Sequence, residues 1–215
     1  CHKFNERVSG EKILALLREG KTVAVITDAG MPVVSDPGNL LVKMLIEAGE
    51  PYTVLPGACA CVTALAFGGL DADRFCFLGF LPEKNAEREA LLAAYRNVRA
   101  TLVFYSAPHD VRRDVETLFS CLGERRAVAV RELTKLHEER VEFRLSAGYP
   151  KEPRGEFVLL VEGAGSENAL NALSPEAHIA HYLSLGLDKK EALKAAAKDR
   201  GVKKSDLYRL SLIHI

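Results

Sequence analysis

The first candidate site is a loop, residues 28–38, that combines acidic side chains with glycine and proline. It follows Thr22–Thr27, a short apolar run rich in β-branched residues, which predicts a buried strand of a parallel sheet. Ligands of open α/β sheets bind beyond the carboxyl ends of the strands, and Gly30 would let the backbone approach a ligand closely. Asp36 and Pro37 predict the start of a helix. A strand-to-helix turn without a ligand explains the same residues.

The second candidate site is the stretch RELTKLHEE, residues 131–139, which mixes acidic, basic and histidine side chains after a predicted strand at 127–130. A glutamate beside a lysine, such as Glu132 and Lys135, could steer a ribose hydroxyl or neutralise a phosphate. A network of surface ion pairs accounts for the same residues. The residue types alone therefore leave both interpretations open.

Composition describes an ordinary globular protein of 215 residues, with 48% hydrophobic and 27% charged residues. The 29 basic residues balance the 29 acidic ones, so any nucleic acid must be met by a local patch. The five cysteines include no CxxC pair, which argues against a disulfide framework or a zinc site and favours a reducing cytoplasm. We expect no metal, because the sequence has no HxxxH motif or Cys/His cluster that would hold one. We expect no membrane span, because no apolar run approaches about 18 residues.

The loop motif resembles a known signature. TDAGMPVVSDPG (residues 27–38) is similar to SDAGTPxISDPG of the tetrapyrrole-methylase superfamily. Within it, the match is to the small-subunit (16S) ribosomal RNA cytidine 2′-O-methyltransferases. Five further blocks follow in the expected order, namely LPGACA (55–60), DRFCFLGFLPEK (73–84), TLVFYSAPHD (101–110), RELTKLHEE (131–139) and RGEFVLLVEG (154–163).

The resemblance implies an α/β protein with two lobes and a cleft between them that holds S-adenosylmethionine. It also implies a 16S rRNA substrate in the small ribosomal subunit and a homodimer. We place an N-terminal lobe at residues 1–74, a second lobe at 75–165 and a helical tail at 166–215. The last two predicted strands, 140–145 and 156–161, are expected to form an antiparallel pair at the sheet edge.

Site residues carry over by position. The expected donor contacts are Asp28, Gly30, Met31, Cys59, Ala60, Ser106 and Leu133. Glu132 and Lys135 are the expected acceptor-side residues, as general base or electrostatic helper. The chain departs from the family at Cys59, where serine is common, and at residues 104–110, where FYESPHR becomes FYSAPHD. The acid and the arginine of that motif are therefore lost here.

Two basic surfaces are candidates for contact with RNA. The helical tail resembles a helix-turn-helix and holds eight basic and four acidic residues between Asp188 and Arg209. The predicted helix at 83–98 would turn Lys84, Arg88, Arg96 and Arg99 outward as a rim beside the cleft. A solvated surface without a partner also accounts for both patterns.

Two other functions remain open, a carbon methylase of a corrin or porphyrin precursor and a nucleic-acid-binding module without catalysis. The RELTKLHEE block and the basic tail favour the RNA methylase. Compared with the family, about forty residues before Cys1 are expected to be missing, with the first strand of the first lobe. We therefore expect weak binding of the methyl donor, and LSLIHI at the end is expected to be non-native.

Overall fold

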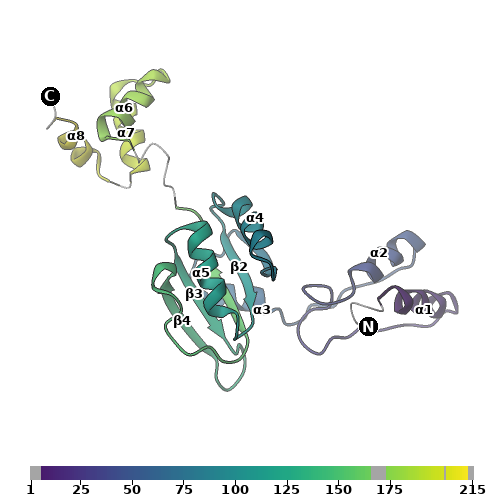
Figure 1. Ribbon diagram of the computed structural model, residues 1–215. Helices are drawn as coiled ribbons and strands as arrows, with labels where there is room; N and C mark the ends of the chain where they lie inside the picture. The colour runs from purple at the N-terminus through teal and green to yellow at the C-terminus, as the bar shows by residue number, and fades with distance from the viewer. Residues whose placement is uncertain (1–5, 166–172, 201, 213–215) are drawn as a thin grey trace.

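The computed structural model describes residues 6–165, 173–200 and 202–212 (Figure 1). A five-stranded sheet with helices on both faces forms its centre. The helices α1 (Glu6–Arg18) and α2 (Asn39–Ala48) pack on each other to one side of the sheet, and α6, α7 and α8 form a separate group toward the C-terminus. The α/β class predicted from the sequence is confirmed.

The sheet has the strand order β1-β2-β5-β3-β4. Its strands are β1 (Phe75–Phe80), β2 (Thr101–Ser106), β3 (Arg126–Arg131), β4 (Glu139–Arg144) and β5 (Phe157–Val161). β1 and β2 are parallel, whereas the other neighbours are antiparallel. The prediction that the last two strands pair with each other is wrong, because β3 lies between them. Every residue of β5 is buried, which suits a central position, whereas β4 alternates buried and exposed residues and forms the edge.

The alternation of side chains along β2 builds a separate core on each face. Val103 points toward α3 (Ala60–Gly68), and Leu102 and Phe104 point toward α4 (Asn85–Tyr95) and α5 (Val111–Leu122). α3 lies so close to the sheet that a Cβ on Gly68 would fall 2.1 Å from Leu160 Cδ1. The sheet is therefore sandwiched between helices, and the ends of its strands remain free to border a site.

The N-terminal segment contains helices but no paired strand among its described residues. The predicted strand Thr22–Thr27 is wrong. This segment and residues 52–55, which have a similar composition, run as irregular chain with exposed apolar side chains, Ile26 being 87% exposed and Leu55 79%. Their composition suits a strand, but a strand forms only where a neighbour satisfies its backbone, and the described chain supplies none there.

The helix after the first loop begins at Asn39, and Asp36 does not cap it. The carboxylate of Glu6 takes that role, accepting hydrogen bonds of 2.8 Å from the backbone N–H groups of both Gly38 and Leu40. A cap from a distant helix thus links α1 to the start of α2. Gly49 ends α2 in the left-handed conformation, as the sequence predicts.

The tail forms α6 (Pro175–Ser184), α7 (Lys189–Asp199) and α8 (Lys204–Leu212) around a small core of its own. Asp188 caps α7 by accepting a 2.8 Å hydrogen bond from the backbone of Glu191, a role that aspartate commonly takes before a helix. Residues 163–168, whose glycine and serine content is typical of a linker, and the ending LSLIHI lie partly outside the described residues. Among the described helices, none is both long and apolar enough to cross a membrane.

Candidate functional site

One hollow of about 640 Å³ lies where the first loop meets the strand ends of the sheet. The loop and the turn before α3 contribute residues 29–31, 34–36 and 58–60. α3 adds Thr63, and the chain at the ends of β1, β2 and β3 and at the start of β5 supplies the rest, namely Phe80, Tyr105, Ser106, Ala107, Pro108, Val130, Leu133, Thr134, Lys135, Glu156, Phe157 and Val158. Segments far apart in the sequence therefore share one site.

Most of the site residues expected from the sequence border this hollow. They are Gly30, Met31, Cys59, Ala60, Ser106, Leu133 and Lys135. Asp28 and Glu132 are not among its lining residues: Asp28 is exposed at the start of the loop, and Glu132 lies beside Lys135. The structure thus gathers the expected residues, and their roles stay a prediction.

Close backbone approach holds the first loop against the turn before α3. A Cβ on Gly57 would lie 3.1 Å from Met31 Sδ, and one on Gly30 would lie 3.7 Å from the carbonyl oxygen of Ala58. Gly30 also has a φ of 73°, a conformation that glycine adopts without strain. The glycines of the motif therefore allow the two segments to meet at the mouth of the hollow.

The wall of the hollow is mostly apolar, with a few charged groups. Tyr105 stacks edge-to-face with Phe77 and Phe80, at ring-centroid distances of 4.9 and 5.6 Å. Burial raises the pKa of the Tyr105 hydroxyl, so this group stays neutral. Asp36 and Glu156 add carboxylates and Lys135 adds an ammonium group. This lining fits a largely apolar ligand that carries both a cationic and an anionic group.

Ion pairs fix the loop after β3. Glu132 Oε1 accepts hydrogen bonds from the backbone of Glu156 at 2.9 Å and from Lys135 Nζ at 3.2 Å, and Lys135 Nζ also donates to Glu156 Oε2 at 2.8 Å. The Glu156 N–H and the Lys135 ammonium lower the pKa of Glu132. The carboxylates of Glu156 and Glu132 raise the pKa of Lys135, which keeps it charged. Glu132 is therefore a weak proton acceptor, and Lys135 is a fixed positive charge at the hollow.

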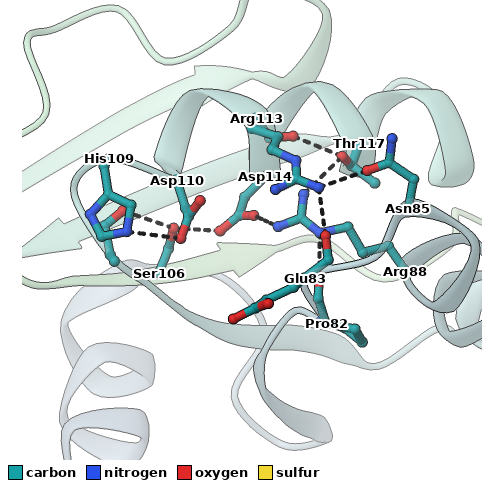
Figure 2. A network of polar contacts seen from close by, with 11 residues as sticks. Pro82, Glu83, Asn85, Arg88, Ser106, His109, Asp110, Arg113, Asp114 and Thr117 are labelled. Atoms are coloured by element: carbon teal, nitrogen blue, oxygen red, sulfur yellow. Dashed lines mark hydrogen bonds and ion pairs between the residues drawn. The ribbon is translucent and has the colours of Figure 1, made fainter.

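Sequence reasoning missed a buried polar group next to the hollow. Arg88, expected to point outward, is only 2% exposed and pairs with Asp114, which is 3% exposed (Figure 2). The spacing of residues predicts this burial, because Arg88 lies four residues before the buried Leu92 and therefore on the same face of α4. Asp114 lies between Val111 and Val115 on the apolar face of α5, a position that predicts burial. The rim proposed for RNA on this helix therefore lacks Arg88.

Comparison with known proteins gives a family and several relatives. Residues 2–147 match the family described as tetrapyrrole (corrin/porphyrin) methylases. A ribosomal RNA small subunit methyltransferase I from Halalkalibacterium halodurans is 40% identical over 97% of this chain and 75% of its own length. Its namesake from Bacillus subtilis is 38% identical over 96% of this chain and 74% of its own length.

Solved structures resemble the fold. The methyltransferase CobJ aligns with a TM-score of 0.57 at 24% identity, over 72% of this chain and 70% of its own. Diphthine synthase aligns with a TM-score of 0.58 at 15% identity, over 76% of this chain and 68% of its own. At these identities the likeness shows a shared fold.

Proposed function

Because this chain belongs to the tetrapyrrole (corrin/porphyrin) methylase family, we propose that it methylates a cytidine ribose 2′-oxygen of small-subunit ribosomal RNA with S-adenosylmethionine. The observation that carries the proposal is one hollow bordered by residues from all six motif blocks. The names of the relatives, which are 38–40% identical over nearly the whole chain, support the RNA substrate.

The hollow fits the methyl donor. Small residues at its mouth, including Gly30, Ala58 and Ala60, leave room for backbone contacts with a ligand. The ring of Tyr105 offers a face for an adenine or a sulfonium, and Asp36 and Glu156 offer negative charge. We therefore assign Gly30, Met31, Cys59, Ala60, Ser106 and Leu133 to donor contact, with Asp28 at the base of the same loop. S-adenosylmethionine supplies an electrophilic methyl group on a sulfonium, whose departure leaves a neutral thioether.

Lys135 is assigned to the acceptor side. Methyl transfer needs the donor methyl and the ribose oxygen held in line, and the oxygen must lose its proton. The ammonium of Lys135 would favour the developing oxyanion or hold a neighbouring phosphate. Glu132 fixes that ammonium within 3.2 Å, so its assigned role is to orient Lys135 rather than to accept the proton itself.

The proposal also covers the form of the substrate, the cellular location and the assembly state, none of which the relatives' names specify. We assign the assembled small subunit containing 16S rRNA as substrate, in the cytoplasm, and a homodimer as the active species. The basic helix α7 supports RNA contact, because Lys189, Lys190 and Lys194 lie on it and are exposed. Exposed apolar residues such as Val54 and Leu55 support a subunit contact.

The test is methyl transfer by the full chain from radiolabelled S-adenosylmethionine to purified small subunits, at saturating donor. Label is expected in one ribose-methylated cytidine, found by mass spectrometry of the digested RNA. Lys135→Gln is expected to lower the rate at least about tenfold. Arg112→Gln, which removes an exposed ion pair with Glu152 outside the hollow, is the matched control. Labelling of a corrin precursor but not of RNA would refute the assignment of RNA as substrate. RNA binding without any methyl transfer would refute the proposed methyltransferase activity.

A further inference from the structure

Three buried residues form a polar group directly behind the hollow. Arg88, Asp114 and Ser106 are each no more than 3% exposed. The Ser106 hydroxyl donates a 2.5 Å hydrogen bond to Asp114 Oδ2, and the guanidinium of Arg88 pairs with Asp114 Oδ1 (Figure 2). Burial raises the pKa of the Asp114 carboxyl against the opposing effects of Ser106 and Arg88.

This group ties together the ends of two parallel strands. Ser106 is the last residue of β2 and borders the hollow. Arg88 Nε donates a 2.6 Å hydrogen bond to the carbonyl of Pro82, two residues after the end of β1 at Phe80, which also borders the hollow. The Arg88–Asp114 pair therefore links the two strand ends that form one wall of the site.

Stability alone is a weak reason for such a pair. Removing two charges from water costs about as much as their attraction returns, so apolar replacements of buried ion pairs are often neutral or stabilising. The geometry gives another reason. The pair directs the Ser106 hydroxyl away from the hollow, so residues 106–108 present their backbone to a ligand.

The buried group also explains how the turn 106–108 tolerates a departure from the family motif at position 106. Position 106 is serine here, where the family motif has glutamate. In a glutamate, the carboxylate oxygens lie about 2.4 Å from Cγ, the atom that corresponds to the serine Oγ. Asp114 Oδ2 lies 2.5 Å from that Oγ. The carboxylate of Asp114 therefore lies at the distance from this atom at which the carboxylate of a glutamate at 106 would lie.

We propose that Asp114, held by Arg88, is the positioning residue of the 106–108 turn and replaces the carboxylate that position 106 lacks. It acts through Ser106 and does not touch the ligand itself. That the turn serves S-adenosylmethionine rests on the proposed function. The positioning of the turn is a property of the chain with or without a ligand.

The test is a charge relocation in the full chain. Asp114→Ala leaves Arg88 without its carboxylate, and Ser106→Glu alone puts two carboxylates beside one guanidinium. Each single variant is expected to weaken S-adenosylmethionine binding, measured by calorimetry, at least about tenfold. The double variant Ser106→Glu/Asp114→Ala returns one carboxylate to the same place and is expected to bind within about threefold of wild type.

Leu118→Ala separates positioning from stability. Leu118 lies on the same helix, is fully buried and does not line the hollow, so its truncation destabilises the fold without touching the turn. It is expected to change donor affinity less than about threefold. Hydrogen exchange of the peptide covering 104–112, without ligand, is expected to speed up in Asp114→Ala and return to wild type in the double variant.

The outcomes distinguish the two proposals. A double variant no better than the singles, in affinity and in exchange, overturns the positioning role. Unchanged affinity and exchange in Asp114→Ala overturns it as well. Rescue of exchange together with no donor binding by any form, wild type included, supports the positioning role and overturns the donor assignment.

Discussion

The contact between α3 and the sheet gives a prediction with a calculable size. In Gly68→Ala the new Cβ would lie 2.1 Å from Leu160 Cδ1, whereas apolar carbons meet at about 3.5–4.0 Å. Leu160 is fully buried in the central strand β5, so it has no free space to turn into. Overpacking of this kind costs about 1–3 kcal/mol of unfolding free energy. Either α3 moves away from the sheet or Leu160 leaves its rotamer.

Movement of α3 would reach the hollow. The helix begins at Ala60, which borders the hollow, and a displacement of about 1 Å can cost about a hundredfold in a site that needs exact placement. Urea denaturation followed by circular dichroism measures the stability, and calorimetry measures donor affinity. We expect both to fall in Gly68→Ala.

Two further variants make the reasoning refutable. Leu160→Val removes the clashing methyl carbon, so it should cost less stability in the Gly68→Ala background than in wild type. Gly123→Ala meets no atom within 4 Å, but its φ of 80° strains an alanine, so it should lower stability without lowering donor affinity. If Gly68→Ala loses less than about 0.5 kcal/mol, or if Leu160→Val brings no relief, the close packing inferred here is refuted.

Three other predictions concern single side chains. Cys59 borders the hollow, so a maleimide should label it and S-adenosylmethionine should slow the labelling in a mass-spectrometric time course; Cys61, buried and with its pKa raised to about 11, should stay unlabelled. The pKa of Glu132 is lowered from 4.5, so its contribution to stability is present above pH 4.5 and is lost as pH falls. The stability deficit of Glu132→Gln in urea should therefore shrink at acid pH, with the exposed Glu116→Gln as control. Asp188→Ala should lower the stability of the α6–α8 group by about 1 kcal/mol and speed hydrogen exchange at the start of α7, because it removes the cap.

Each of these has a result that contradicts it. Equal labelling of Cys59 with and without donor would remove it from the donor site. A deficit of Glu132→Gln that stays constant down to pH 3 would mean that its ion pair and backbone bond add nothing to folding. Unchanged exchange in α7 of Asp188→Ala would show that the cap contributes nothing to its first turn.

Local sequence signals are enough to predict the bounds of some helices. The bounds of α2, Asn39–Ala48, follow from one apolar face and from Gly49, which ends the helix. Strands are harder to predict than helices, because a strand forms only when it pairs with a neighbour. Thr22–Thr27 has the composition of a buried strand, yet its backbone groups need a neighbour that no local pattern supplies, and the segment stays irregular.

Contacts between residues far apart in the sequence are what local patterns do not predict. The position of β5 between β2 and β3 depends on which strand can be buried on both faces, a property of the whole sheet. The motifs locate the loops of the site, whereas Arg88 and Asp114 carry charged side chains, a type of residue that is almost never fully buried unless it is paired. Their spacing among apolar neighbours predicts burial, but only the fold shows that they meet each other.

Backbone strain marks the same region independently of any motif. Among the described residues other than glycine, positive φ occurs only at Val33, Ser35, Glu132 and Thr134. Such conformations cost about 1–2 kcal/mol per residue, and Val33 and Thr134 are β-branched, which disfavours them further. All four lie in the two loops that border the hollow, one before α2 and one after β3. Strain survives only where surrounding contacts determine the backbone, as the 3.0 Å hydrogen bond from the Glu132 N–H to the Glu156 carbonyl does here. Two loops from distant parts of the chain, both strained and both facing one hollow, are therefore better explained by a shared ligand than by the demands of folding alone.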